Sequence, residues 1–354
     1  MFEFIYNIIW FILRTILFLF PPELAHNFTF FIIKILFKTP FVKKIEKSRY
    51  TVKNKNLERS VFGLNFSNPV GLAAGFDKNA ELINDWDAFG FSFVEIGTVT
   101  PKPQYGNKKP RLFRLKKDKA LVNRMGFNNQ GLHKVLSRLK KKKTNLIIGG
   151  NIGKNKATPL DQSVDDYKIC FNSLFDYVDY FVLNISSPNT PQLRELQKKD
   201  KLEHLISSIQ QINNLKQKPK PILIKISPDL EYKYVDEILF LISKYKISGI
   251  VATNSTNSRD NLNTNIKKIK KIGPGGLTGL PIKNMSTNMI KYIYNKSSGS
   301  IPIIAVGGIM TASDAIEKLE AGASLIQLYS GFVYEGPLLI KKINKEILKQ
   351  KSRL

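Results

Sequence analysis

The feature of this sequence that most constrains its fold is a regular alternation of short apolar runs and longer helix-period stretches from about residue 60 onward. The apolar runs are rich in β-branched residues and are bounded by glycine, proline or polar residues. Apolar residues along nearly the whole of each run indicate strands buried on both faces. The predicted strands are Pro69–Ala73, Phe93–Val99, Leu146–Asn151, Tyr180–Ile185, Ile222–Ile226, Gly249–Thr253, Ile303–Val306 and Ser324–Leu328.

The stretches between these runs carry apolar residues at helical spacing. Strands that alternate with helices predict a parallel sheet with right-handed crossovers, and eight such units favour a closed (β/α)₈ TIM barrel, an α/β fold. An open doubly wound sheet is the alternative, but no glycine-rich dinucleotide-binding sequence follows the first strand in the required form. Predicted helices include Asn128–Lys142, Asp161–Val178, Leu202–Leu215, Tyr232–Lys246 and Thr311–Ala321.

Residues 1–41 differ from the rest of the chain because they are almost wholly apolar and aromatic. Arg14 interrupts the first apolar segment, and Pro21 and Pro22 separate it from the second. Two helices lying in a membrane surface fit this pattern better than a cleaved signal peptide, and a single transmembrane span is the alternative. We therefore predict a membrane-associating helical segment at residues 1–41 and a barrel domain at residues 42–354.

The net charge of +27 suggests an anionic partner, which could be nucleic acid, anionic lipid or an acidic substrate. The lysines are scattered over helix faces and loops, and no basic stripe interleaved with aromatic residues is present. We therefore expect no nucleic-acid partner. Cys170 is the single cysteine, so no intramolecular disulfide can form. The absence of such a disulfide is what a reducing compartment would give.

Catalytic side chains of a TIM barrel come from the carboxyl ends of its strands, and the two longest connections, residues 101–125 and 254–280, follow strands and should cover that face. No carboxylate pair or histidine–aspartate cluster occupies these ends, which disfavours metal-assisted hydrolysis, glycosidase chemistry and a histidine-based triad. Amides are abundant instead, and several converging amides suit a flat ligand with alternating N–H and C=O groups, such as a pyrimidine. The amide candidates are Asn123, Asn128, Asn151, Asn184, Asn189 and Asn254.

The last two predicted strands end in glycine-containing turns at Gly307–Gly308 and Tyr329–Gly331. Exposed backbone N–H groups and a following helix are typical of the phosphate site of a barrel, so a phosphorylated ligand or cofactor is expected. Lys225 lies inside an otherwise apolar strand. A buried lysine needs an anionic or polar partner.

Several motifs, in order along nearly the whole chain, resemble those of dihydroorotate dehydrogenases. Ser187 stands where the soluble class of that family has a cysteine, and the apolar extension with Glu23–Phe30 also resembles the quinone-reducing, membrane-associated class. The motifs are Asn68–Lys78, Glu95–Pro101, Asn123–Asn128, Asn184–Thr190 and Ile224–Asp229.

The resemblance implies oxidation of dihydroorotate to orotate in pyrimidine (UMP) biosynthesis, with FMN as hydride acceptor and a membrane quinone as final acceptor. It implies a peripheral location on the cytoplasmic side of the cell membrane (the inner membrane), in contact with lipids. FMN contacts would fall on Ala74, Gly75, Phe76, Asp77, Lys78, Thr98, Asn151, Asn184, Lys225, Thr253, Gly279, Gly308, Tyr329 and Ser330. Dihydroorotate contacts would fall on Lys78, Asn123, Arg124, Met125, Gly126, Phe127, Asn184, Asn189, Asn254 and Ser255.

In this interpretation Ser187 is the catalytic base, Lys78 meets the substrate carboxylate, and Lys225 stabilises negative charge on the reduced flavin. Serine is a weak base alone, so Thr190 and a water sheltered by Phe127 are the expected proton relay. Ser255 replaces a more usual threonine but keeps the hydroxyl. Quinone would arrive along the N-terminal helices, with the passage to the flavin lined by His26, Arg114 and Tyr329.

Two other functions compete with this interpretation. A flavin-dependent tRNA-uridine reductase on the same barrel would suit the charge, but it needs a cysteine acid above the flavin, and Cys170 falls in mid-helix. A non-catalytic membrane-binding barrel would have no reason to keep Lys78, Asn184, Ser187 and Lys225 together.

Overall fold

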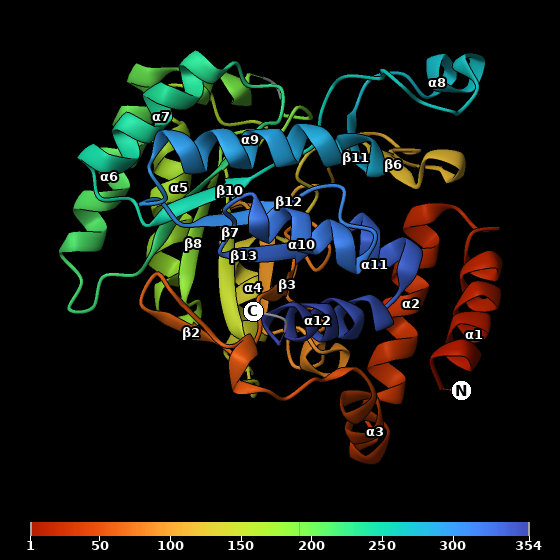
Figure 1. Cartoon of the computed structure of the whole chain (residues 1–354). Helices are drawn as coiled ribbons and strands as arrows, with labels where there is room; N and C mark the ends of the chain where they lie inside the picture. Colours follow the sequence, from red (N-terminus) through yellow and green to blue (C-terminus); the bar gives the residue numbers. More distant parts are fainter. Residues whose placement is uncertain (1, 191, 353–354) are drawn as a thin grey trace.

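The computed structural model describes residues 2–190 and 192–352, and its centre is a closed barrel of eight parallel strands (Figure 1). Each barrel strand pairs with the next one along the chain, and β13 closes the ring by pairing with β3. The TIM-barrel prediction is confirmed, as are all eight predicted strands, with ends that differ by one residue at most. The strands are β3 (Val70–Leu72), β4 (Phe93–Val99), β7 (Ile147–Ile152), β8 (Tyr180–Asn184), β9 (Ile222–Ile226), β10 (Gly249–Ala252), β12 (Ile303–Val306) and β13 (Leu325–Leu328).

Helices surround the barrel, and the five predicted between the strands are confirmed with shifted ends. The first is shorter than predicted because Gly131 has a φ of 77°, so the chain turns there and the helix cannot extend further back. The helices of the barrel are α4 (Gly131–Leu139), α5 (Ser163–Leu174), α6 (Lys199–Asn214), α7 (Tyr232–Lys244), α9 (Lys283–Lys296), α10 (Ala312–Glu320), α11 (Ser330–Glu335) and α12 (Leu338–Lys351). Short 3₁₀ turns are η1 (Lys55–Leu57), η2 (Trp86–Phe89), η3 (Lys116–Asp118), η4 (Phe175–Tyr177), η5 (Leu193–Gln197) and η6 (Leu280–Ile282).

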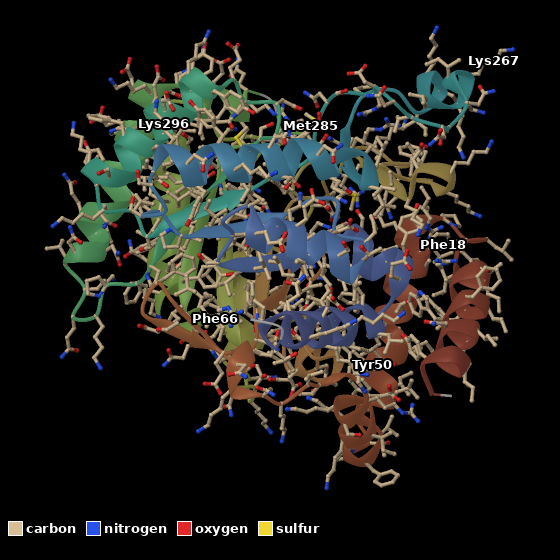
Figure 2. The ribbon with its side chains drawn as sticks, viewed as in Figure 1. Phe18, Tyr50, Phe66, Lys267, Met285 and Lys296 are labelled. Atoms are coloured by element: carbon tan, nitrogen blue, oxygen red, sulfur yellow. The ribbon has the colours of Figure 1, made fainter. Side chains whose placement is uncertain are left out.

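Aromatic side chains fill the inside of the barrel, and glycines on neighbouring strands make room for them. A Cβ on Gly71 would lie 2.4 Å from the Phe93 ring, and one on Gly149 would lie 2.3 Å from the Tyr180 ring. A hairpin of β1 (Arg59–Val61) and β2 (Leu64–Phe66) closes the amino-terminal end of the barrel. Phe66, labelled in Figure 2, packs edge-on against Phe93. The other end of the barrel therefore holds the free space.

The two long connections form a small sheet of their own, which the sequence did not reveal. Strands β5 (Leu112–Leu115) and β6 (Ala120–Asn123) come from the first connection, and β11 (Gly276–Gly279) comes from the second. They pair antiparallel in the order β11-β6-β5. The second connection also contains α8 (Ile266–Ile272) at the upper right of Figure 1. This pairing fastens the two loops together above the carboxyl ends of the barrel strands.

Three helices precede the barrel: α1 (Phe2–Leu17), α2 (Pro22–Leu36) and α3 (Pro40–Tyr50). The helices α1 and α2 lie together at one side of the barrel (Figure 1). Arg14 of α1 binds the barrel domain: its guanidinium and the Trp10 indole both donate to the Tyr334 carbonyl of α11. The predicted domain boundary between residues 41 and 42 lies inside α3.

None of the helices within residues 2–190 and 192–352 combines the length and the apolar character needed to span a bilayer. Large apolar side chains are nevertheless exposed along both of the first two helices and the turn between them. Several are about half exposed or more: Ile9, Phe11, Ile12, Leu19, Phe20, Leu24, Phe28 and Phe31.

Candidate active site

A cavity with about 990 Å³ of empty space opens at the carboxyl ends of the barrel strands. Most of the predicted site residues, which are spread over more than 250 positions of sequence, line this one cavity. They are Ala74, Gly75, Lys78, Thr98, Asn123, Met125, Gly126, Phe127, Asn184, Ser187, Asn189, Lys225, Thr253, Asn254, Ser255, Gly279, Gly308, Tyr329 and Ser330.

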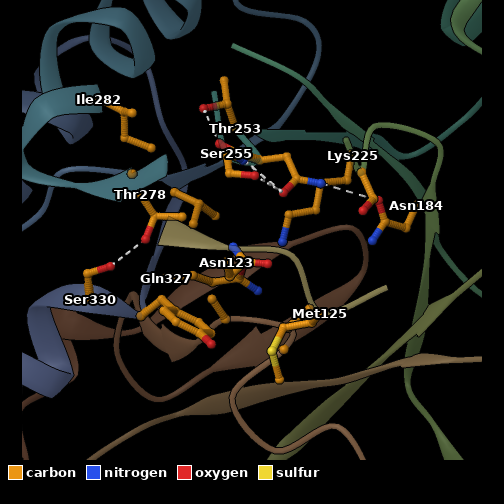
Figure 3. A pocket seen from close by; sticks show the side chains of 18 of the residues that line it. Asn123, Met125, Asn184, Lys225, Thr253, Ser255, Thr278, Ile282, Gln327 and Ser330 are labelled. Carbon is orange, nitrogen blue, oxygen red and sulfur yellow. Dashed lines mark hydrogen bonds between the residues drawn. The ribbon is translucent and has the colours of Figure 1, made fainter. Parts of the chain in front are cut away.

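Four of the six predicted amides line the cavity and are linked in pairs, whereas Asn128 and Asn151 do not line it. The Asn189 side-chain amide donates to Asn123 Oδ1 at 3.1 Å, and Asn254 Nδ2 lies 3.4 Å from Asn184 Oδ1. Figure 3 shows Asn184 and Lys225, which come from adjacent strands, on the same side of the cavity. Asn123 reaches the cavity from β6, in the small sheet above the barrel. The cavity is therefore bounded by the barrel below and by the paired loops above.

Charge in the cavity is one-sided. Lys78 and Lys225 line the cavity, and no acidic side chain is among the described residues that line it. The Lys78 ammonium donates to the Gly75 carbonyl at 3.0 Å, and burial lowers the pKa of Lys78 to about 8, although Glu23 and Asp77 partly offset that effect. A buried ammonium of this kind is well suited to bind an anionic group.

Ser187 lies on the turn after β8 and is buried. Its hydroxyl oxygen accepts a hydrogen bond from the Asn189 backbone N–H at 3.3 Å. Thr190, three residues further on, is also buried, and its hydroxyl has no hydrogen-bond partner among residues 2–190 and 192–352. A hydroxyl with free hydrogen-bonding capacity close to Ser187 along the chain is compatible with the predicted proton relay.

Glycine backbone lines the end of the cavity near β12 and β13. Gly307 and Gly308 both have positive φ values, and a Cβ on Gly308 would lie 2.3 Å from the Lys283 Cα. The hydroxyls of Ser330 and Thr278 lie 2.7 Å apart beside these turns. Because Gly307 and Gly308 have no side chain, their backbone leaves room for a phosphate group, which fits the phosphate site expected from the sequence.

Four predicted site residues do not line the cavity. Asp77 points into the protein, where its carboxylate accepts from the backbone N–H groups of Glu81 and Leu82 and from the Trp86 indole. Burial raises the pKa of Asp77. Phe76 packs on the other side of the same turn, 5.5 Å from the ring of Tyr329.

The remaining two lie above and below the cavity. Arg124 stacks on Phe113 and donates to the Pro274 carbonyl at 2.9 Å, so it fastens the two long loops on their outer side. Asn151 lies beneath the cavity, where its Oδ1 accepts from the Thr98 hydroxyl at 2.5 Å. The two chain neighbours of Arg124, Asn123 and Met125, do reach the cavity.

Sequence reasoning missed other residues of the cavity wall. The most informative is Gln327, a polar residue in the otherwise apolar strand β13, which shows the same signal that singled out Lys225. Glu95 in β4 shows that signal too, although it lies behind the cavity wall. Further wall residues without a sequence prediction are Ala73, Thr278, Ile282, Val306 and Ile309, whereas Gly307 and Gly331 belong to the glycine-containing turns predicted from the sequence.

A second cavity, with about 800 Å³ of empty space, lies between the N-terminal helices and the barrel. Its wall is mostly apolar, and it includes His26, Arg114 and Tyr329, the three residues expected along a quinone passage. Burial and the charge of Lys78 lower the pKa of His26 to about 4, so its imidazole is neutral near pH 7. Tyr329 lines both cavities.

Comparison with known proteins fits this geometry. The family model described as dihydroorotate dehydrogenase matches residues 56–350. The chain belongs to the dihydroorotate dehydrogenase family. It is 55% identical over 339 residues to a protein of Christiangramia forsetii named dihydroorotate dehydrogenase (quinone), covering 96% of this chain and 98% of that protein. A Synechococcus protein of the same name is 48% identical over 307 residues, covering 83% of this chain and 80% of the relative.

Solved structures of the dihydroorotate dehydrogenase family have the same architecture. The enzyme of Eimeria tenella, crystallised in complex with ferulenol, superimposes with a TM-score of 0.83 at 35% identity, over 94% of this chain and 92% of that one. Its ligand-free form gives a TM-score of 0.82 at 36% identity, over 94% of this chain and 95% of that one.

Proposed function

We propose that this chain is a quinone-dependent dihydroorotate dehydrogenase that uses FMN to oxidise dihydroorotate to orotate in pyrimidine biosynthesis. The observation that carries the proposal is the pair of cavities. One is polar, basic and rich in amides, the other is apolar and adjoins the N-terminal helices, and Tyr329 lines both. Two substrates of opposite polarity that exchange electrons through one cofactor need such an arrangement.

The residues of the first cavity fit FMN. Glycine backbone at Gly307, Gly308 and Gly331 leaves room for its phosphate, and the absence of acidic groups among the described lining residues favours an anion. Lys225, in the wall of the same cavity, supplies positive charge. Bound FMN would supply the acceptor for a hydride from the substrate and the donor of electrons to the quinone.

Dihydroorotate would occupy the part of the cavity below the paired loops. Lys78 would hold its carboxylate, and the amides of Asn123, Asn184, Asn189 and Asn254 would pair with the edge of its ring. Ser187 would remove the proton from the carbon next to the ring carbonyl, and the Thr190 hydroxyl would carry that proton onward.

The other flavin chemistry considered for this barrel, tRNA-uridine reduction, receives no support from the cysteine it would need. Cys170 lies in α5, fully buried, and its thiol contacts the Val99 carbonyl at 3.7 Å. Burial raises its pKa well above the ordinary value. A thiol in that position does not line the cavity and is a poor acid toward a bound base.

We further propose that the exposed apolar faces of α1 and α2 lie in the surface of the cell membrane on its cytoplasmic side, so that quinone enters the second cavity from the lipid. Half-exposed side chains such as Phe11, Phe28 and Phe31 would be buried in the acyl boundary. The basic surface of the protein would favour anionic headgroups. No nucleic-acid partner is proposed.

Cofactor analysis tests the proposal directly. The purified full-length protein should be yellow, and mass spectrometry of the heat-released cofactor should find one FMN per chain. Reduction of that flavin by dihydroorotate without oxygen, followed by its reoxidation with a quinone, should complete the cycle. A folded protein that holds NAD, FAD or no cofactor would refute the proposal.

A further inference from the structure

Glu95 is a carboxylate inside the barrel with no solvent exposure. The mechanism above gives it no role. Residues of β4 alternate between the two faces of the barrel wall, so Glu95 points inward like Phe93. Three side chains from three other strands surround its carboxylate. They are Asn151 (Nδ2 to Oε1, 2.7 Å), Gln327 (Nε2 to Oε2, 2.6 Å) and Lys225 (Nζ to Oε1, 3.7 Å).

The carboxylate determines which way the neighbouring amides point. An ionised carboxylate only accepts hydrogen bonds, so Asn151 must present its NH₂ group to Glu95 and its carbonyl oxygen away from it. That oxygen accepts from the Thr98 hydroxyl at 2.5 Å and from Asn184 Nδ2 at 3.3 Å. The Asn184 NH₂ group donates to Asn151 Oδ1 and to Thr98 Oγ1. Its carbonyl oxygen therefore faces Asn254 Nδ2.

One buried charge thus fixes a directed series of hydrogen bonds that runs from Glu95 to the amides of the cavity wall. Without an acceptor-only group at its start, each amide could reverse its donor and acceptor ends at little cost, because the nitrogen and oxygen ends have nearly the same shape. In a fraction of the protein molecules, an N–H group of a flat ligand would then face an amide NH₂, or a ligand C=O group would face an amide oxygen.

The same carboxylate also controls charge. Lys225 lines the cavity, whereas Glu95 lies behind the cavity wall, 3.7 Å from the ammonium. With side chains 6% and 0% exposed, the two charges interact with little screening by water. Glu95 therefore limits the positive potential that Lys225 exerts on a ligand in the cavity.

We propose that Glu95 is a positioning residue for the flavin and substrate. It sets the orientation of Asn151 and Asn184 and moderates the charge of Lys225. This inference rests on the proposed function, because it requires a flavin in the cavity. Glu95 does not line the cavity, and it acts through side chains that do line it, such as Asn184 and Lys225.

The test is Glu95→Gln in the flavin-loaded full-length protein, with two readouts other than turnover. The first is the midpoint potential of the bound flavin, measured by equilibration with a reference dye. Removing the negative charge leaves Lys225 uncompensated and favours the reduced, more negative flavin, so the potential should rise by about 30 mV, which corresponds to about tenfold in a two-electron equilibrium. Lys225→Met should shift it downward, and the double variant should return toward the wild-type value.

The second readout is the affinity for orotate, obtained from the change in flavin absorbance during titration. Glu95→Gln should weaken it by roughly tenfold, since at least one hydrogen bond of the ring edge is mismatched in part of the population. Glu203→Gln is the matched control, because Glu203 is on the outer surface of α6 and pairs with Lys244 at 2.6 Å. That variant should keep both wild-type values.

An unchanged or lowered potential in flavin-loaded Glu95→Gln, or an unchanged orotate affinity, would overturn the role of Glu95. If Glu95→Gln holds no flavin, Glu95→Asp decides, because it keeps the charge: bound flavin with a potential near the wild-type value supports the proposal, and loss of flavin there as well overturns it. Wild-type protein without flavin would instead refute the proposed function, so the two failures are distinguishable.

Discussion

A partly buried ion pair contributes to the attachment of α2 to the barrel, and we predict that Glu23→Gln loosens that helix. The Glu23 carboxylate faces Arg111 in a two-pronged arrangement, with Oε1 2.5 Å from Nη2 and Oε2 3.2 Å from Nε. Arg111 is 7% exposed and also donates to the backbone carbonyls of Tyr105 and Asn107. The pair therefore ties α2 to the loop that leads to the cavity.

The magnitude follows from the burial of the two partners. Removing one partner of a fully buried pair costs about 3–5 kcal/mol, whereas an exposed pair contributes about 0–1 kcal/mol. The Glu23 side chain is 20% exposed, and glutamine keeps one hydrogen bond, so we expect a loss of about 2 kcal/mol in the free energy that holds α2 in place. Because about 1.4 kcal/mol is a factor of ten, α2 should open about 30-fold more often.

Hydrogen exchange measured by mass spectrometry tests this prediction. Amides of α2 should exchange about 30-fold faster in Glu23→Gln, while those of β8 in the barrel should not change. Glu231→Gln is the matched control: its pair with Lys233 at 2.9 Å is exposed to solvent, so its effect should stay below about 0.5 kcal/mol. Unchanged exchange in α2, or equal acceleration in α2 and β8, would refute the reasoning.

The same pair predicts a dependence on pH. Burial alone would raise the pKa of Glu23, but the hydrogen bond and charge of Arg111, together with Lys109 and Lys78, lower it below its ordinary value. A carboxyl whose pKa is lowered on folding contributes stability that is fully present above its unfolded pKa and is lost as the pH falls through the folded value. Protection of α2 should therefore decrease below about pH 4.5 in the wild type, and Glu23→Gln should lack this component.

Three further predictions concern the two half-reactions. Ser187→Ala should keep FMN and the fold but slow anaerobic flavin reduction by dihydroorotate by about 10²–10⁴-fold, and unchanged kinetics would exclude Ser187 as the base. The value of kcat/KM for dihydroorotate should fall as the pH rises above about 8, because Lys78 then loses its proton, and a profile that is the same in Lys78→Gln would contradict this assignment. Deleting residues 1–37 removes α1 and α2 and leaves α3 whole, and it should leave flavin reduction by dihydroorotate unchanged. Oxidation of the flavin by a long-tailed quinone and binding to anionic vesicles should both decrease sharply. If the FMN-loaded truncated protein is still oxidised by quinone, these helices serve only as an anchor.

The sequence determined the barrel and the end of it that holds the site. Strands covered on both faces must be apolar along their whole length, so the eight runs were visible without knowledge of their partners. Parallel strands all direct their carboxyl ends to one side, so residues that follow different strands, such as Lys78 and Asn184, could be grouped before any contact was known.

Tertiary structure decided which residues of each motif face the cavity. Loop residues have no fixed period, so the sequence could not separate Lys78, which lines the cavity, from Asp77, which points into the protein. The same holds for Asn123 and Arg124. The antiparallel sheet of β5, β6 and β11 depends on hydrogen bonds between two distant loops, and its short strands carry no sustained alternation of their own.

The apolar cavity and the position of Glu95 are also products of tertiary packing. His26 and Tyr329 come from opposite ends of the chain and share one cavity only because α2 packs beside the turn after β13. Glu95 and Gln327 stand out in apolar strands just as Lys225 does, so the sequence marks all three as buried polar residues. Their mutual contacts depend on the register of the barrel strands, which fixes the partner of each buried polar group and is set only when the barrel closes.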